Sequence, residues 1–356
     1  MTRISHATIN VPAQQLLQLT ADILRHRGVP LADADYVAWH LVETNLRGTD
    51  SHGIARLPHY VRRLDKGSIC ARPEITFAPR SASTGLLEGG HGLGHVVMKR
   101  AVEEAEEMAR KAGAGWVAVA NSSHCGALAP LGLQLAERGY IGLVFSHVDP
   151  MVLPHGAREP FCGTNPICLT APGDEETTLC LDMATSIVPW NVVANAQQEG
   201  VALQEGWAVD GRGNDTTDPH EVQALYPFGQ HKGSGLGIMI DVFCSMLSGA
   251  PFGPDIPRMY GDLGEERRLG GLVGAIAIDR FVALPVFRKR VTEMAHRLNR
   301  LNPAPGVERV RFPGEPELEM KRRRSREGVP VGLQLYAELN DLADAAGLPR
   351  LVGKTS

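Results

Sequence analysis

The sequence has few cysteines, and none of them stand in the pairs that mark a zinc site or a redox motif. No C-x-x-C spacing occurs among the six, which are Cys70, Cys125, Cys162, Cys168, Cys180 and Cys244. Scattered cysteines are typical of free thiols in a reducing compartment. His91 and His95 stand four apart, but glycines lie between them, so a loop or helix cap is favoured over a metal site. We therefore expect structural thiols and no metal.

No apolar run of about 18 residues, the length that suggests a membrane-spanning helix, occurs in the sequence. The opening MTRISHATINVPAQQ also lacks the apolar core of a secretory leader. The sequence therefore predicts a protein that does not span a membrane and stays in the cytoplasm.

A large charge excess of either sign is missing as well. The formal net charge is -4 and 21% of the residues are charged, which gives no basic surface for nucleic acid or for an anionic membrane. The one strongly basic stretch, residues 321–326, is best explained as a solvated face. Because 43% of the 356 residues are hydrophobic, the chain is long enough for two domains with a sizeable core. The expected partner is a small molecule.

Apolar residues recur at helical spacing in several parts of the chain. The pattern predicts two helices within residues 11–47, one over 95–112 and one over 332–346. Residues 285–301 have the pattern of a basic amphipathic helix, and residues 233–247 that of a buried helix.

Short apolar runs predict buried strands, at residues 116–120, 141–145, 178–183 and 272–278. A helix-like segment separates the first two, and strand, helix, strand is typical of an α/β layer. We expect a central sheet domain over residues 76–284. Residues 1–75 plus 285–350 are expected to form a mainly helical domain from both termini.

The stretch from Asp50 to Tyr60 carries several residue types that bind and transform a small acid. Ser51 can donate or accept a hydrogen bond, His52 can hold a proton, and Arg56 offers a two-pronged donor for a carboxylate. If the stretch is one helix, His52 and Arg56 share a face, and Asp50 or Ser51 caps it. The alternative is an ordinary surface turn between two helices.

A second candidate, Asn121-Ser-Ser-His-Cys-Gly126, follows a predicted strand and precedes a helix, where α/β sheets place ligand sites. His124 could serve there as acid or base, or it could be a hydrogen-bonded structural histidine. Asp149 follows the next strand along the chain, so its carboxylate is expected at the same edge of the sheet. His124 and Asp149 could meet there.

Two glycine clusters suggest a dinucleotide site, but neither has the spacing of a Rossmann fingerprint. They comprise Gly90, Gly92 and Gly94, and Gly233, Gly235 and Gly237. Neither gives G-x-G-x-x-G after a first strand, so a standard Rossmann site is not expected. Lys232 before the second cluster could hold a phosphate at a helix start, while the alternative is that the glycines allow close helix packing.

Motifs spread over nearly the whole chain resemble those of one known family. They are Arg47-Gly-Thr-Asp-Ser-His-Gly-Ile-Ala-Arg56, Asn121-Ser-Ser-His-Cys-Gly126, Gly163-Thr-Asn-Pro166, Asp182-Met-Ala-Thr185, Lys232-Gly and Asn302-Pro-Ala-Pro-Gly306. In this order they resemble the malate/L-lactate dehydrogenase type II family, also called sulfolactate-dehydrogenase-like. The resemblance implies a mixed α/β sheet with a non-Rossmann dinucleotide-binding fold. It also implies NAD or NADP as cofactor, a small 2-hydroxy or 2-keto acid as substrate, and a homodimer or larger homo-oligomer.

The resemblance also implies roles for individual residues. His124 corresponds to the catalytic acid/base, with Ser51, His52, Arg56 and Tyr60 around the substrate. The cofactor-binding positions correspond to Asp182, Met183, Ala184, Lys232, Arg290, Gly314, Glu315 and Pro316. Val148 stands where similar enzymes have a serine that contacts the cofactor, so only a backbone contact is expected there.

The loop that begins at Asp149 is most similar to that of family members that oxidise ureidoglycolate. For that substrate Asp149 is a candidate acceptor for the ureido N–H groups, and alternatively it orients His124. Other substrates in the family are malate, lactate, sulfolactate, a diketo sugar acid, or a cyclic imino acid reduced with NADPH. Two further hypotheses are a metal-dependent hydrolase that uses His52, His124, Asp149 and Cys125, and a noncatalytic binding protein.

Overall fold

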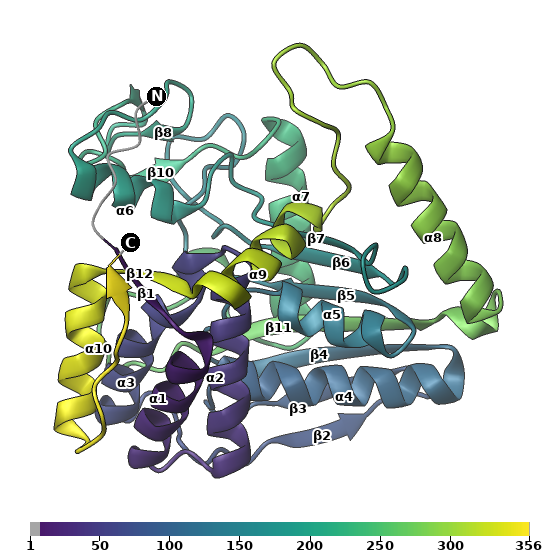
Figure 1. The fold of residues 1–356 in the computed structure, drawn as a ribbon, viewed down its shortest axis with the longest axis horizontal. Helices are drawn as coiled ribbons and strands as arrows, with labels where there is room; N and C mark the ends of the chain where they lie inside the picture. The colour runs from purple at the N-terminus through teal and green to yellow at the C-terminus, as the bar shows by residue number, and fades with distance from the viewer. Residues whose placement is uncertain (1–7, 356) are drawn as a thin grey trace.

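The computed structural model describes residues 8–355 and has a seven-stranded mixed sheet at its centre (Figure 1). The strand order is β2-β3-β4-β11-β5-β6-β7. The strands comprise β2 (Thr76–Pro79), β3 (Thr84–Glu88), β4 (Ala114–Ser122), β11 (Leu269–Ala277), β5 (Tyr140–Ser146), β6 (Ile167–Ala171) and β7 (Leu179–Met183). Of the paired neighbours only β3 and β4 are parallel. The predicted α/β class is confirmed. The prediction that the chain has no secretory leader was based on residues 1–15, of which residues 1–7 lie outside the described part.

The long strand β11 separates β4 from β5 and pairs antiparallel with both. Its glycines let neighbouring groups approach closely. A Cβ at Gly270 would lie 2.0 Å from the Cys244 carbonyl oxygen, and one at Gly274 would lie 2.4 Å from the Trp116 ring. Any larger residue at these two positions would push the layers apart.

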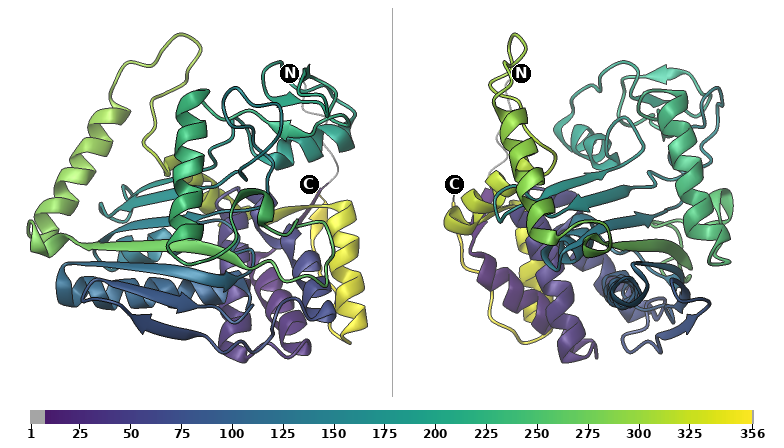
Figure 2. Two further views of the ribbon diagram at one scale, coloured as in Figure 1. Left: turned by 180° about the vertical axis from the view of Figure 1, so that it is seen from behind. Right: turned by 90° about the vertical axis from the view of Figure 1, so that its right-hand side faces the viewer.

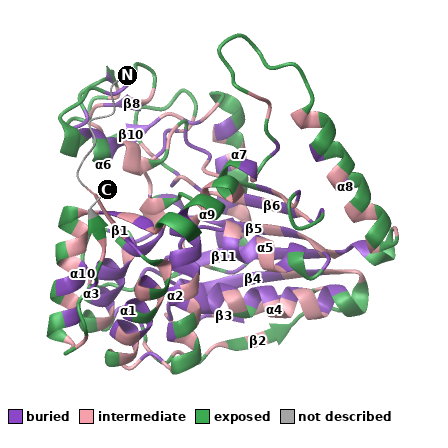
Figure 3. Ribbon diagram, in the orientation of Figure 1, coloured by how far each residue is buried: buried purple, intermediate pink, exposed green. Residues whose placement is uncertain are grey.

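Helices cover both faces of the sheet. On one face lie α4 (Gly94–Ala112) and α5 (Ala129–Glu137), and α4 ends at Gly113, whose φ of 87° suits glycine (Figure 1). On the other face α7 (His231–Asp241) continues into a π-helical turn, Val242–Met246 (Figure 2, seen from behind). The strands between these helices are the most buried part of the sheet (Figure 3).

The two ends of the chain pack together in a second, mainly helical body. It contains α1 (Ala13–His26), α2 (Leu31–Leu46), α3 (Leu57–Lys66) and α10 (Leu333–Ala345), which share one apolar core. A small sheet of order β12-β1-β13 joins the termini, formed by β1 (Thr8–Val11), β12 (Val329–Gly332) and β13 (Lys354–Thr355). In the described part of the chain, no helix is long and apolar enough to cross a membrane.

Helix α8 (Leu284–Asn299) does not join the terminal helices, although the sequence pattern groups it with them. It stands at the far end of the central sheet (Figures 1 and 2), where Arg288 donates to the Glu137 carbonyl at 3.3 Å. A long connection then returns to α9 (Glu315–Glu327), which packs on α2. A small lobe contains α6 (Trp190–Glu199), β8 (Ala208–Val209), β9 (Asp215–Thr216) and β10 (Ala224–Leu225).

All six cysteines are free, and five of them are buried. This agrees with their expected role as structural thiols.

Candidate active site

A cavity of about 520 Å³ lies where the helical body, the sheet and the small lobe meet. Its volume is typical of a site for a small molecule or cofactor. Many of the residues predicted from sequence line its wall: Ser51, His52, Arg56, His124, Val148, Asp182, Met183, Ala184, Gly314 and Pro316. Chain segments far apart in the sequence therefore converge on one site.

The stretch that carries Ser51, His52 and Arg56 is not the single helix that its spacing suggested. Two 3₁₀ turns, η1 (Asp50–His52) and η2 (Ile54–Arg56), precede α3 and are separated by Gly53. A Cβ at Gly53 would lie 2.2 Å from the Asn45 side-chain oxygen, which accepts the Ile54 N–H at 2.7 Å.

Asp50 does not act as the helix cap either. Its carboxylate accepts two hydrogen bonds from Arg324, at 2.7 and 2.9 Å. This ion pair ties the turn to α9. The double turn still brings Ser51, His52 and Arg56 into the cavity wall.

His124 lies in the cavity wall just beyond β4, and a buried tyrosine holds its ring. The Tyr60 hydroxyl is 2.7 Å from His124 Nδ1, and the Gly126 N–H donates to the same nitrogen at 3.3 Å. Burial, followed by the charges of neighbouring groups such as Arg56, lowers the pKa of His124 well below its usual value, so the imidazole is neutral. The neutral ring carries one proton, and the Tyr60 hydroxyl can donate to Nδ1 when this proton is on Nε2 or accept from Nδ1 when it is there. Tyr60 was expected around the substrate, but it is fully buried behind His124.

Asp149 does not meet His124, because its carboxylate is paired with Arg267. The Arg267 NH2 group donates to Asp149 Oδ1 at 2.6 Å, and the two side chains are 1% and 11% exposed. Burial lowers the pKa of Arg267 to about 10, although the charge of Asp149 acts in the opposite direction. The expectation that Asp149 orients His124 is therefore wrong, and sequence spacing gave no sign of Arg267.

A buried arginine of α3 fixes the segment that leads to Arg267. Arg63 donates to the carbonyl oxygens of Met259 at 3.0 Å and Glu265 at 2.9 Å. Tyr260, which this segment carries into the cavity wall, accepts a hydrogen bond from Arg56 NH1. Tyr260 is thus a cavity residue to which no role was assigned from the sequence.

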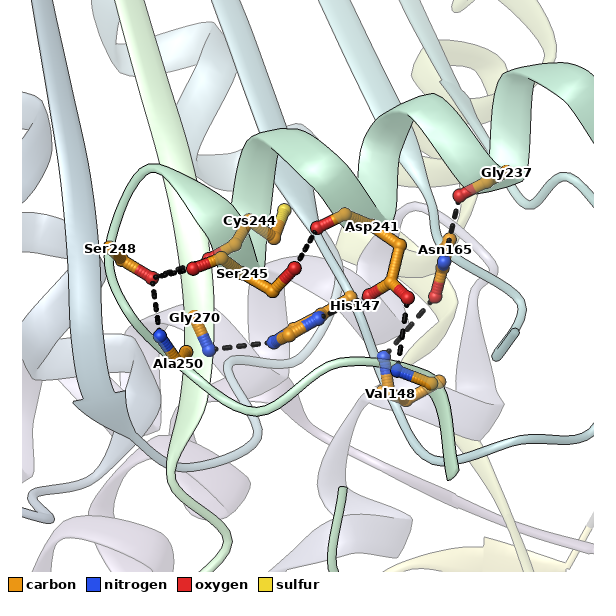
Figure 4. Close-up of polar contacts among 11 residues, drawn as sticks. His147, Val148, Asn165, Gly237, Asp241, Cys244, Ser245, Ser248, Ala250 and Gly270 are labelled. Carbon is orange, nitrogen blue, oxygen red and sulfur yellow. Dashed lines mark hydrogen bonds and ion pairs between the residues drawn. The ribbon is translucent and has the colours of Figure 1, made fainter. Parts of the chain in front are cut away.

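A buried polar network positions the loop that carries Val148 and Asp149 (Figure 4). His147 Nδ1 lies 2.7 Å from Asp241 Oδ1, and the Gly270 N–H donates to His147 Nε2 at 2.8 Å. Because Nε2 accepts, His147 carries its proton on Nδ1 and donates it to Asp241. The Val148 N–H donates to Asn165 Oδ1 at 3.3 Å, so this backbone donor is already engaged.

Asp182 occupies the place where many nucleotide-binding folds put a phosphate. Its Oδ2 accepts the backbone N–H groups of Leu128 at 3.0 Å and Ala129 at 2.7 Å, at the start of α5. Burial, with a smaller contribution from Glu317, raises the pKa of Asp182 to about 6 despite these bonds. A free helix N-terminus attracts anions, but this one is filled by the protein's own carboxylate.

The comparisons with known proteins agree with this site. The sequence profile described as malate/L-lactate dehydrogenase matches residues 11–340. The chain belongs to this family. Ureidoglycolate dehydrogenase (NAD(+)) of Escherichia coli strain K12 is 34% identical over 331 residues, which cover 93% of this chain and 95% of that enzyme. Malate dehydrogenase of Pyrococcus abyssi strain GE5 / Orsay is 34% identical over 353 residues, which cover 96% of each chain.

Solved structures of family members have the same fold. The sulfolactate dehydrogenase from Methanocaldococcus jannaschii matches with a TM-score of 0.89 at 32% identity, covering 96% of this chain and 98% of that chain. The expected family, its mixed α/β fold and its character as a dehydrogenase of 2-hydroxy acids are thereby confirmed.

A nicotinamide dinucleotide, which a dehydrogenase family implies, fits the groups of this cavity. Apolar residues such as Leu181, Trp190 and Phe312 offer surfaces for flat rings. The guanidinium groups of Arg47, Arg56 and Arg311 belong to residues of the same wall. Such groups suit a negatively charged ligand.

Three of the cofactor-binding residues assigned through the family resemblance lie outside the cavity wall. Lys232, in the first turn of α7, and Arg290, on α8, are exposed. Their role in cofactor binding stays a prediction. Glu315 is buried and accepts from Arg309 at 2.7 Å, which shapes the turn before α9. Residues 8–355 contain no group of three His, Cys, Asp or Glu side chains that could hold a metal ion.

Proposed function

We propose that this protein transfers a hydride between NAD and C2 of a small 2-hydroxy acid, with ureidoglycolate as the substrate and oxalurate as the product. One observation carries the reaction class: His124, a buried neutral imidazole backed by Tyr60, shares one cavity wall with Arg56. This arrangement supplies a proton-transfer group and a carboxylate-binding group within the same small volume.

The chemistry divides between two ends of the substrate. The Arg56 guanidinium takes the carboxylate, with Ser51 and His52 beside it, and so fixes the position of C2. His124 takes the hydroxyl proton during oxidation and returns it during reduction. A bound nicotinamide ring supplies the hydride acceptor.

The Tyr60 hydroxyl supports either direction of proton transfer. It donates to His124 Nδ1 when the proton is on Nε2, and after rotation it can accept when the proton is on Nδ1. Burial keeps the pKa of Tyr60 above its usual value, so it remains a neutral hydroxyl.

Ureidoglycolate is favoured by the likeness to the Escherichia coli enzyme and by the loop that starts at Asp149. NAD is favoured by the name of the same relative. Malate is the second candidate, because the Pyrococcus abyssi enzyme has the same identity over slightly more of the chain. Sulfolactate, lactate, and keto or imino acids reduced with NADPH are further candidates.

We also propose a cytoplasmic homodimer that covers the outer face of α7. Ile238, Met239, Met246 and Leu247 are between 38% and 58% exposed along α7 and the π-helical turn that follows it, although this segment was predicted to be buried. Several large apolar side chains exposed along one helical segment favour a protein interface there. Light scattering during size-exclusion chromatography would give the molar mass, and a monomer would refute this part of the proposal.

The substrate proposal is tested by following reduced nicotinamide absorbance with purified protein, NAD or NADP, and ureidoglycolate, malate, lactate or sulfolactate. We expect NADH to form with ureidoglycolate and only weakly with the other acids. His124→Ala is the matched control, because it should abolish turnover while cofactor binding is kept. Turnover of another acid, or activity only in reduction with NADPH, would exclude ureidoglycolate and keep the family.

A further inference from the structure

We infer that Tyr260 binds the carboxylate of the acid substrate together with Arg56. The inference rests on the proposed function, in which Arg56 takes this carboxylate, and it holds for any of the candidate acids. Tyr260 and Arg56 both line the cavity, and Arg56 NH1 donates a hydrogen bond to the Tyr260 hydroxyl oxygen. The guanidinium and the hydroxyl therefore stand side by side in the wall.

The hydrogen bond between these two side chains leaves a donor on each of them. Arg56 uses Nε on the Ser51 carbonyl at 2.6 Å and NH1 on Tyr260, and a guanidinium has further N–H groups for a carboxylate. An arginine can only donate, so the Tyr260 oxygen accepts and its own proton is not used in this bond. In the described part of the chain no acceptor takes that proton. Because the oxygen accepts from a cation, the O–H group becomes a stronger donor to a carboxylate held beside it.

Several contacts fix the position of Tyr260, although it is 66% exposed. Its ring meets the His59 ring edge to face, with 5.5 Å between the ring centroids. The buried Arg63 donates to His59 Nε2 at 3.0 Å and to the Met259 carbonyl at 3.0 Å, so one side chain holds both the ring contact and the adjoining backbone. A hydroxyl that is in place before the ligand arrives binds it at a smaller entropic cost.

The alternative is that the Tyr260 hydroxyl only holds its loop in place. The same loop has anchors that do not involve this hydroxyl. Arg63 donates to the Glu265 carbonyl at 2.9 Å, and the Ser68 hydroxyl donates to the Leu263 carbonyl at 2.5 Å. The loop is thus held without the Tyr260 hydroxyl, which favours a role in binding a ligand.

The test separates binding of the acid from binding of the cofactor. Steady-state kinetics of the full-length protein are measured with the cofactor and the acid that the wild type turns over best, and NADH affinity is measured by fluorescence titration. The variants are Tyr260→Phe, which keeps the ring and removes the hydroxyl, Arg56→Leu, and the two combined. Tyr140→Phe is the matched control, because Tyr140 lies partly buried at the start of β5 and outside the cavity wall.

We expect Tyr260→Phe to raise KM for the acid by about tenfold to a hundredfold, the range for losing a hydrogen bond to a charged group. The value of kcat should change little, since this bond forms in the bound substrate and in the transition state alike. Because Tyr260 and Arg56 hold one carboxylate, the double variant should lose less than the two single changes predict together. NADH affinity and the unfolding temperature should stay at the wild-type values, and Tyr140→Phe should behave like the wild type throughout.

Several outcomes would overturn the inference. An unchanged KM for Tyr260→Phe would remove the hydroxyl from the substrate site, and a lower unfolding temperature beside it would leave only a role in holding the loop. Independent effects of Tyr260→Phe and Arg56→Leu would show that the two residues do not share one carboxylate, and weaker NADH binding would place Tyr260 at the cofactor. A wild-type protein that turns over no 2-hydroxy or 2-keto acid would refute the proposed function and the inference together, whereas turnover of malate in place of ureidoglycolate would refute only the substrate assignment.

Discussion

The buried ion pair between Asp149 and Arg267 leads to a prediction that separates a structural role of Asp149 from a role in substrate binding. Asp149→Asn removes the negative charge but nearly keeps the shape of the side chain. It leaves the Arg267 guanidinium, which is 1% exposed, without its anion. Nε and NH1 of Arg267 already have no hydrogen-bond partner in the described part of the chain, so no other group is available to compensate.

The expected cost is large on the scale of protein stability. Breaking a buried ion pair by removing one partner typically costs about 3–5 kcal/mol, because the remaining charge stays buried. Typical domains are stable by about 5–15 kcal/mol, so Asp149→Asn should remove a substantial share. The double variant Asp149→Leu with Arg267→Met has no buried charge and should lose less than either single change.

Denaturant unfolding followed by circular dichroism would measure these differences. Asp344→Asn is the matched control, since Asp344 pairs with Arg350 at the surface and its loss should have little effect. An ordinary surface substitution changes the free energy of unfolding by about 0.5 kcal/mol or less. If Asp149→Asn changes it no more than this while KM for the acid rises, the reasoning fails. Asp149 would then be a substrate contact, as the sequence first suggested.

Three further predictions concern the site and its support. Arg56→Leu should raise KM for the acid by one to two orders of magnitude with NADH affinity unchanged, because a charge-assisted carboxylate contact is lost; an unchanged KM would remove Arg56 from the site. Burial lowers the pKa of His40 to about 3 and that of His95 well below its usual value, so the folded state keeps both neutral while the unfolded chain gains protons below about pH 6.5. The free energy of unfolding should therefore fall as the pH drops from about 6.5 toward 4.5, by up to about 1.4 kcal/mol per pH unit for each histidine, and His95→Phe should flatten this slope in urea titrations; equal slopes would show that His95 does not contribute. An asparagine at position 241 cannot accept both hydrogen bonds that Asp241 accepts, from His147 and from the Gly253 N–H, so Asp241→Asn should lower both stability and the affinity for NADH. A loss of stability alone would limit the network of Figure 4 to a structural role.

Much of the fold follows from local patterns in the sequence. The periodicity over residues 11–47, 95–112 and 332–346 predicted helices that the structure contains as α1, α2, α4 and α10. The order of the sheet could not be predicted in this way. Strand β11 pairs with β4 and β5, which precede it by more than a hundred residues, and no local pattern records such a partner.

The candidate site was predictable where a motif carries its own chemistry, and unpredictable where the partner is distant. Ser51, His52, Arg56 and His124 were singled out from short motifs, and all four line one cavity. Asp149 follows β5 as His124 follows β4, and this position correctly predicted that both residues lie at the same edge of the sheet. Its actual partner, Arg267, lies 118 residues further along the chain, so its role could not be read from the neighbouring sequence.

The position of Asp182 gives a physical reason why this chain has no Rossmann fingerprint. The unit of β4 and α5 has the strand-to-helix order that such a fingerprint requires, but its helix start is held by a carboxylate from β7. The loop between β4 and α5 is therefore free to carry His124. The phosphate charge of a bound dinucleotide would then be met elsewhere in the wall, which contains Arg47, Arg56 and Arg311.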